Sequence, residues 1–433
     1  MGKTRPLRPE SSSIQSLTVE GFKSIDVERT IDIRPLTILA GANSSGKSSI
    51  IQPLLLLKQT LEAPYDPGPL LLNGPNVKFT AVSQFLPKTR RGPTVGTFSF
   101  GVAVALDSRC RIFFRKTNDL PVDLERVEFE WQGSRDEFKP GEVDISQTPF
   151  KDDTLVKSLV GGASVKRVRF TRNRCFIDAS LLIDGSTIFP LPVGNEQIVD
   201  AISRIIHIPG LRGNPQRTYP LTAIGDRFPG RFDEYVASVI ASAQPDVLQQ
   251  LGDDLQALGL TWKVQARNVD ETQVELQVGR LPKSAVGGEM DLVSIADVGF
   301  GVSQTLPVVV ALLIAKPGQF VYIEQPEIHL HPRAQAAMAG LLARAANRGV
   351  RVVVETHSSL LLLGIQQLIA EDTLDPANVR LHWFKRDDTG ATNITTAELD
   401  AAGTLGDWPV DFDDVSLDAQ KRFLDAAEKK LAP

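Results

Sequence analysis

Residues 41–48 read Gly41-Ala42-Asn43-Ser44-Ser45-Gly46-Lys47-Ser48 and fit the pattern G-x-x-x-x-G-K-[ST]. The apolar run Leu36-Thr37-Ile38-Leu39 leads into this stretch, and an apolar helical run begins near Ser49. A strand, a glycine-rich turn and a helix, in that order, are the context in which this pattern binds phosphate. The sequence therefore predicts a phosphate-binding loop between a buried strand and a helix.

The residue types of this loop suit a nucleotide with its cation. Glycines let backbone N–H groups wrap around phosphates, and the N-terminus of the following helix adds a partial positive charge. We expect Lys47 to reach the β- and γ-phosphates of ATP and Ser48 to ligate Mg²⁺. The predicted nucleotide-binding residues belong to the loop and the helix start: Gly41, Asn43, Ser44, Ser45, Gly46, Lys47, Ser48 and Ser49.

Two further apolar runs end in polar residues. Residues 319–323 lead into EQPEIHLHP at 324–332, and residues 351–354 lead into Glu355-Thr356-His357-Ser358. A phosphate-binding loop needs an acidic residue at the end of a neighbouring strand to hold Mg²⁺, directly or through water. Glu324 is the candidate for that role, and the imidazole of His357 stands at a strand end where it could reach a γ-phosphate.

The rest of the chain alternates between strand-like and helical patterns. Residues 14–39 read as short strands, and residues 96–131 as strands separated by turns, which is typical of antiparallel sheets. Residues 195–260 have apolar positions at helical spacing, and residues 292–383 alternate strands with helices, which favours a parallel sheet. The phosphate loop and Glu324 are much farther apart than one βαβ crossover requires. We therefore expect them to share one sheet that is interrupted by an insert.

Composition excludes several classes of protein. The 433 residues hold 47 Lys and Arg against 52 Asp and Glu, a net charge of −5, so contact with nucleic acid must rest on a local patch. Two cysteines argue against a disulfide framework and a cysteine-based zinc site. The longest apolar stretch, residues 306–315, is too short to span a bilayer. We expect a soluble, cytoplasmic protein with no membrane partner.

The order of phosphate loop, long insert, glycine-rich segment, EQPEIHLHP and ETHS resembles the ABC-type ATPase heads of the SMC, RecF and OLD class. IEQPEIHLHP, DVGFGVSQTLP (297–307) and LGDWPVDF (405–412) are similar to a prokaryotic AAA ATPase branch. Some relatives of that branch serve in phage defence, as the ATPase subunit of Septu does. The resemblance covers roughly residues 14–100 and 290–415.

This resemblance implies an α/β fold: a P-loop ABC-type ATPase head, with a mixed sheet and flanking helices, and with antiparallel β and helical insert subdomains. The expected parts are an N-terminal part of the head with Walker A (14–105), a β and helical insert (106–290), a C-terminal part of the head with the signature loop, Walker B and switch histidine (291–400), and a tail with a helix (401–433).

Carried over by position, the resemblance makes Glu324 the Walker B metal carboxylate, Gln325 the occupant of the catalytic-base position and His357 the switch histidine. Walker B usually reads Asp-Glu, whereas this chain has a glutamine at the second position, and its amide cannot accept a proton. Two alternatives stay open. Either hydrolysis is slow, or Glu327, two residues further on, has become the base.

Residues 297–304 stand where the signature loop of the family is expected. They lack the usual Ser-Gly-Gly, but Gly299, Gly301 and Ser303 could face the γ-phosphate of a partner. The resemblance therefore implies a homodimer, or a higher oligomer, in which two protomers sandwich two ATP molecules. It also implies a separate effector protein, since the chain carries no nuclease motif.

Three functions fit these observations. The first is an ATP-gated ATPase, DNA-associated or in phage defence, that works with the effector. The second is a scaffold or binding module that uses ATP as structural glue and hardly hydrolyses it. The third is the nucleotide-binding subunit of an ABC transporter, which the long insert and the unusual signature loop argue against.

A basic run and a histidine pair are weaker signals. On a strand, Arg167 and Arg169 share a face that could follow the phosphates of DNA or RNA, although a solvated strand face explains it as well. The whole run comprises Lys166, Arg167, Arg169, Arg172 and Arg174. Glu327, His329 and His331 have the spacing of metal ligands on an extended segment, but a packed loop is the favoured interpretation. Arg212 and Arg217 lie in a loop that also resembles the family, and they receive no role.

Overall fold

The computed structural model describes residues 13–88, 96–104, 108–117, 121–131, 133–152, 166–183, 186–281 and 291–406. The expected C-terminal tail and helix lie outside the described residues from 407 onward. The described part is a mixed α/β structure with four sheets, which confirms the expected fold class. Among its helices, none has both the length and the apolar character needed to cross a bilayer.

Six strands form the central sheet in the order β12-β17-β18-β3-β19-β20. The first five are parallel, and the last pairs with β19 in antiparallel fashion. The strands are β3 (Leu36–Gly41), β12 (Ile206–Ile208), β17 (Phe320–Glu324), β18 (Arg351–Glu355), β19 (Val379–Arg386) and β20 (Thr392–Ala397). The prediction that the loop strand and the strand ending at Glu324 share one sheet is confirmed, with β18 between them.

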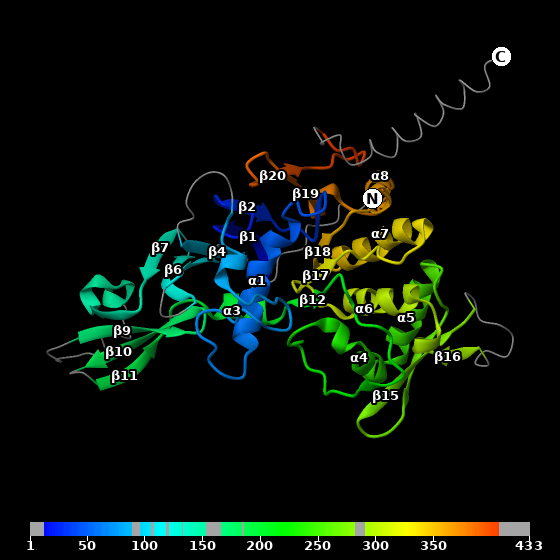
Figure 1. Ribbon diagram of the computed structural model, residues 1–433, viewed down its shortest axis with the longest axis horizontal. Coiled ribbons are helices and arrows are strands. Elements are labelled where there is room, and N and C mark those ends of the chain that lie inside the picture. The colour runs from blue at the N-terminus through cyan, green and yellow to red at the C-terminus, as the bar shows by residue number, and fades with distance from the viewer. Residues whose placement is uncertain are drawn as a thin grey trace, which may run out of the picture.

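Different helices cover the two faces of this sheet (Figure 1). Alternate residues of β17 point to opposite faces, so Phe320 and Tyr322 join the core beneath α1, and Val321 and Ile323 join the core beneath α6 and α7. The helices are α1 (Lys47–Glu62), α3 (Glu196–Ser203), α4 (Val236–Ser242), α5 (Pro245–Ala257), α6 (Phe300–Ile314), α7 (Pro332–Asn347) and α8 (Ser359–Ala370). The helices expected within 195–260 are thus confirmed.

Three antiparallel sheets surround the central one. The first has the order β2-β1-β4-β5-β6-β7, with β1 (Ile14–Glu20), β2 (Arg29–Asp32), β4 (Thr97–Val104), β5 (Ser108–Arg115), β6 (Asp123–Trp131) and β7 (Ser134–Phe138). The second has the order β11-β10-β9-β8, with β8 (Gly141–Asp144), β9 (Lys166–Asn173), β10 (Phe176–Ile183) and β11 (Ser186–Leu191).

The third contains β13 (Tyr219–Pro220), β14 (Val264–Asn268), β15 (Gln273–Gly279) and β16 (Leu292–Ser294). Strands β9–β11 lie at one end of the molecule, and β15 and β16 lie toward the other (Figure 1). The expected antiparallel strands within 96–131 are confirmed. Strands β5 and β6 belong to the same sheet as β1 and β4, on both sides of the expected boundary at residue 106. The division of the chain into these parts stays a prediction.

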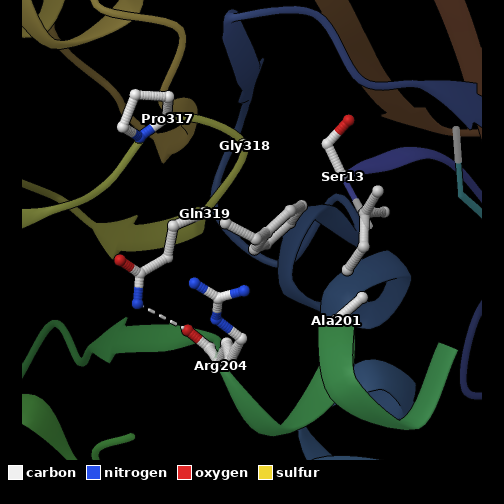
Figure 2. A pocket seen from close by; sticks show the side chains of 8 residues that line it. Ser13, Ala201, Arg204, Pro317, Gly318 and Gln319 are labelled. Atoms are coloured by element: carbon white, nitrogen blue, oxygen red, sulfur yellow. Dashed lines mark hydrogen bonds between the residues drawn. The ribbon is translucent and has the colours of Figure 1, made fainter. Parts of the chain in front are cut away.

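A glutamine ahead of β17 is hydrogen-bonded to the end of α3. The Gln319 amide donates to the carbonyl of Arg204 at 2.9 Å (Figure 2). Its oxygen accepts the N–H of Lys316. The small cavity beside it, of about 20 Å³, has room for about one water molecule. The hydrogen bond from Gln319 to Arg204 thus joins the start of β17 to the end of α3. In the parallel strands that follow, His207 of β12 pairs with Tyr322 of β17.

Candidate nucleotide-binding site

Gly41 and Gly46 occupy positions of the phosphate loop at which another residue would not fit. Gly41 and Gly46 have φ angles of 141° and 105°, which side-chain-bearing residues rarely adopt. A Cβ at Gly41 would meet the Phe384 carbonyl at 2.3 Å, and one at Gly46 would meet the Thr392 hydroxyl at 2.3 Å. That hydroxyl donates to the Ser45 carbonyl, so β20 supports the loop from behind.

The side chain of Lys47 is hydrogen-bonded to the backbone of its own loop. Its ammonium donates to the carbonyls of Gly41 at 2.9 Å and Ala42 at 2.8 Å. Burial lowers the pKa of Lys47, against the opposing fields of Glu355 and Glu327. A phosphate oxygen is a stronger acceptor for an ammonium group than a carbonyl is, so a bound nucleotide can take over these hydrogen bonds.

The hydroxyl of Ser48 contacts a carboxylate that sequence reasoning missed. It lies 3.0 and 2.9 Å from the two carboxylate oxygens of Glu355, and the Tyr322 hydroxyl donates to one of them at 2.8 Å. Burial raises the pKa of Glu355, while its hydrogen bonds from Tyr322 and Ser48 act in the opposite direction. A signal existed in the sequence, because Glu355 ends an apolar run just before the proposed switch histidine.

Glu324, the predicted metal carboxylate, forms hydrogen bonds with β12 and the segment after it. One of its carboxylate oxygens lies 3.2 Å from Nε2 of His207, and the other accepts the N–H of Gly210 at 3.0 Å. Burial opposes ionisation, yet the hydrogen bonds from His207 and Gly210 and the nearby Arg212 lower the pKa of Glu324 overall. His207 is buried, stacks on Tyr322 and contacts Asn76 through Nδ1 at 2.9 Å. Sequence reasoning missed His207 as well.

Glu327 and His357 meet at the phosphate loop. One carboxylate oxygen of Glu327 accepts the backbone N–H of His357 at 2.8 Å, and its Oε2 is buried without a hydrogen-bond partner among the described residues. Burial and the charge of Lys47 lower the pKa of His357, while the backbone of Gly41 acts in the opposite direction. Glu327, His357 and Lys47 therefore lie together beside the phosphate loop.

Gln325 directly follows the last residue of β17. Its backbone is left-handed, with φ of 47°, and its N–H donates to the carbonyl of Glu355 at 2.7 Å. Its side-chain oxygen lies against Gly210, where a Cβ would meet it at 3.6 Å. The amide thus packs on the segment after β12, beside the carboxylate of Glu324.

The expected signature loop forms the start of α6. Gly299 is the N-cap and is exposed, Gly301 lies in the first turn, and the Ser303 hydroxyl donates to the carbonyl of Phe300 at 3.2 Å. The buried guanidinium of Arg212 donates to the carbonyls of Gln304 in α6 and Glu324 in β17, both at 2.8 Å. Burial lowers the pKa of Arg212 to about 10. Arg212 therefore joins the signature helix to the strand that bears Glu324.

The histidine pair after β17 has structural partners. His329 packs against Phe300, with ring centroids 5.9 Å apart, and Nδ1 of His331 accepts the N–H of Arg333 at the start of α7. Within the described ranges, no group of three or more histidine, cysteine or acidic residues could hold a metal ion. The packed-loop interpretation therefore fits these two histidines.

Comparisons with known proteins agree with the motif analysis at a coarse level. A family model described as an AAA domain, putative AbiEii toxin, Type IV TA system matches residues 268–363. This segment contains β17, β18 and His357, and so includes the strand ends that carry Glu324 and Glu355. No curated protein matches the chain.

Among solved structures, the chain is similar to SMC head domains. One is the SmcHead bound to the C-winged helix domain of ScpA, with 13% identity and a TM-score of 0.47 over 90% of this chain and 99% of that one. A second is the SMC head domain from Thermotoga maritima, with 12% identity and a TM-score of 0.39 over 89% and 100%. A third is the Smc head domain with an extended coiled coil bound to the C-terminal domain of ScpA derived from Pyrococcus furiosus, with 10% identity and a TM-score of 0.42 over 89% and 96%.

Proposed function

We propose that the chain is an ABC-type ATPase head that binds ATP with Mg²⁺ and uses it to close a homodimer. The observation that carries this proposal is the group of Lys47, Ser48, Glu327, Glu355 and His357 around one glycine-bounded loop. An ammonium group, a hydroxyl, two carboxylates and an imidazole at the carboxyl ends of parallel strands suit a nucleoside triphosphate and its cation. The AAA match over residues 268–363 supports the same function.

The exposed start of α6 supports the dimer. Gly299 and Phe300 are exposed, and the first N–H groups of a helix are free to bind an anion. In the proposed closed dimer, Gly299, Gly301 and Ser303 face the γ-phosphate bound to the partner. Each nucleotide site is then complete only when two copies meet, so ATP acts as the switch.

Removing the ammonium group of Lys47 tests nucleotide binding. We expect Lys47→Ala to weaken binding of a fluorescent ATP analogue at least a hundredfold, because a charge-assisted contact to two phosphates is lost. Lys316→Ala is the matched control, since this exposed lysine pairs with Asp226 at 2.6 Å, in the loop between β13 and α4. Equal affinity in the wild type and both variants would reject the proposal.

The biological setting is also part of the proposal: phage defence or a DNA-associated process, with a separate effector protein. The family model that matches this chain carries the description of a putative toxin of a toxin–antitoxin system, which is compatible with a defence role. The second candidate, a scaffold that binds ATP and hardly hydrolyses it, is favoured by Gln325. Turnover by the purified protein separates these two, and membrane association tests the transporter alternative.

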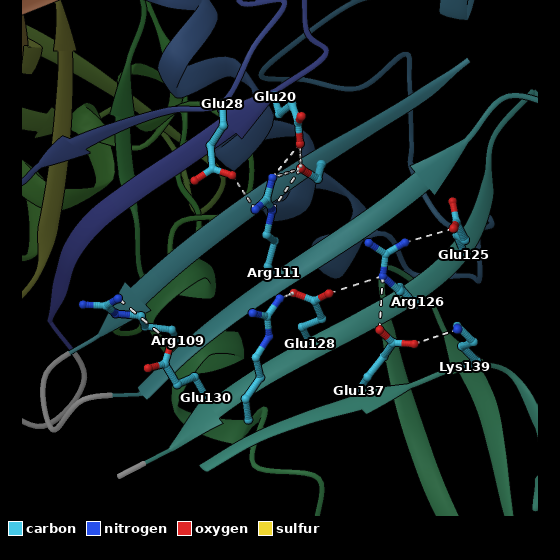
Figure 3. A network of polar contacts seen from close by, with 12 residues as sticks. Glu20, Glu28, Arg109, Arg111, Glu125, Arg126, Glu128, Glu130, Glu137 and Lys139 are labelled. Carbon is cyan, nitrogen blue, oxygen red and sulfur yellow. Dashed lines mark hydrogen bonds and ion pairs between the residues drawn. The ribbon is translucent and has the colours of Figure 1, made fainter. Parts of the chain in front are cut away.

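Contact with DNA or RNA along β9 remains a prediction. Arg167 and Arg169 share Glu142 of β8, at 3.8 and 2.7 Å, and Arg172 pairs with Asp66 at 2.8 Å. The neighbouring sheet neutralises its basic residues in the same way: arginines of β5, β6 and β7 pair with Glu28 and with carboxylates of β1, β6 and β7 (Figure 3). Phosphates must therefore compete with carboxylates for these arginines, and we expect weak binding.

Charge reversal tests this prediction. We expect Arg167→Glu with Arg169→Glu to weaken DNA and RNA binding in fluorescence anisotropy at low salt, and wild-type binding to fall steeply as salt rises. Arg109→Glu is the control, because it alters an exposed ion pair on a different sheet. Affinities that do not change in the double variant would remove nucleic acid from the proposed partners of β9.

A further inference from the structure

We propose that Glu355, and not Glu324, is the carboxylate through which the protein holds the divalent cation that accompanies ATP. This inference rests on the proposed function, since it concerns the cation of the same nucleotide site. It gives this role to a residue to which the sequence motifs assigned none, and it gives Glu324 the role of holding His207 of β12 and Gly210 after that strand.

The first support is the contact between Glu355 and Ser48. Both carboxylate oxygens of Glu355 lie within 3.0 Å of the Ser48 hydroxyl. Two oxygens that bind one Mg²⁺ at about 2.1 Å, at right angles to each other, lie about 2.9 to 3.0 Å apart. The two groups therefore already have the spacing of neighbouring ligands, and hydroxyl and carboxylate oxygens are the hard donors that Mg²⁺ prefers.

The second support is the position of the strands. β18 lies directly beside β3, whereas β17 is one strand further away, about 4.8 Å more distant in the plane of the sheet. The register places Glu324 and Glu355 opposite each other at the ends of the two strands. Of this pair, Glu355 is therefore the carboxylate beside the phosphate loop.

The third support is that both oxygens of Glu324 have their hydrogen-bond partners in β12 and the segment after it, and not in the phosphate loop. His207 contacts one of them, and the N–H of Gly210 donates to the other. His207 is itself held by Asn76 and by stacking on Tyr322. Turning Glu324 toward Ser48 would leave a buried imidazole and a backbone N–H without their acceptor, at a cost of about 1 to 3 kcal/mol for each group.

Glu355 also has an orienting partner of its own. The buried Tyr322 hydroxyl donates to Glu355 Oε2 at 2.8 Å, and the same oxygen lies 2.9 Å from the Ser48 hydroxyl. Carboxylates that bind metals are commonly oriented by such hydrogen bonds. Tyr322 thus supports both carboxylates: its hydroxyl orients Glu355, and its ring supports His207.

Mn²⁺ binding tests the assignment. We would titrate Mn²⁺ into the wild type in the presence of ATP and follow free Mn²⁺ by electron paramagnetic resonance, with nucleotide affinity in EDTA measured in parallel. Glu355→Gln is expected to weaken Mn²⁺ binding at least tenfold without changing nucleotide affinity in EDTA. Glu324→Gln is expected to change Mn²⁺ binding less than threefold, and Glu371→Gln, an exposed carboxylate at the end of α8, serves as the control.

The outcomes separate this inference from the proposed function. A wild type that binds no nucleotide overturns the proposed function, and the inference falls with it. A wild type that binds ATP and Mn²⁺, with equal losses in both variants or a loss only in Glu324→Gln, overturns the inference and leaves the proposed function standing. Thermal melting shows whether each variant is folded, and Glu355→Asp, which keeps the charge, should recover part of the Mn²⁺ affinity.

Discussion

Glu327→Gln is expected to lower the single-turnover rate of ATP hydrolysis by about a hundred- to ten-thousand-fold, the usual contribution of a general base. Glu327 has a buried carboxylate oxygen without a hydrogen-bond partner among the described residues, and its other oxygen accepts the N–H of His357 beside the phosphate loop. Such an oxygen can take a proton from an attacking water. ATP binding should be retained, because Lys47 and Ser48 are unchanged.

Gln325→Glu distinguishes the two alternatives for the base. Since the side chain of Gln325 lies against Gly210, we expect this variant to change the rate little. If Gln325 instead stands at the catalytic position, wild-type turnover falls below about 1 per second and Gln325→Glu accelerates it. His357→Ala should remove residual activity in either case. A brisk wild-type rate that survives Glu327→Gln would refute both accounts.

Lys58→Met is expected to destabilise the fold by about 3 to 5 kcal/mol, the cost of leaving a buried charge without its partner. Lys58 is fully buried in α1, pairs with Glu62, and donates to the carbonyls of Phe228 at 2.9 Å and Gly230 at 3.3 Å. Burial lowers the pKa of Lys58 and raises that of Glu62, each against the field of its partner. Methionine fills a similar volume, so the loss reflects the polar contacts.

Urea denaturation measures this effect. Lys316→Met is the control, because its ion pair with Asp226 is exposed and is expected to contribute less than about 1 kcal/mol. A midpoint for Lys58→Met as high as that of the control would show that the buried pair does not hold the 228–230 loop against α1.

Sequence reasoning succeeded where the signal is local. Gly41 and Gly46 are recognisable because they stand at the fixed glycine positions of the G-x-x-x-x-G-K-[ST] pattern, and their φ angles of 141° and 105° are ones that glycine adopts readily. The predicted alternation of strands and helices within 292–383 is confirmed, and its helix Pro332–Asn347 has a proline in the first turn and Gly349, with φ of 89°, just past the end. These features depend on neighbours in the chain, which a single sequence displays.

The missed residues depend on contacts between distant segments. Glu355 meets Ser48 only because β18 pairs with β3, and His207 meets Glu324 only because a three-residue strand adds to the edge of the sheet. The motif placed Glu324 by its position in EQPE, whereas its hydrogen bonds are set by β12 and the segment after it. Arg212 shows the same limit, since its acceptors lie in α6 and β17.

Light scattering with and without ATP tests the central proposal, a nucleotide-driven dimer, most directly. We expect the wild type to have the mass of one chain without nucleotide and of two chains with ATP and Mg²⁺. Lys47→Ala should keep the mass of one chain in both conditions, and Glu327→Gln should hold the ATP-bound dimer longest because hydrolysis is slow. The same mass in all three proteins, with and without ATP, would contradict the account.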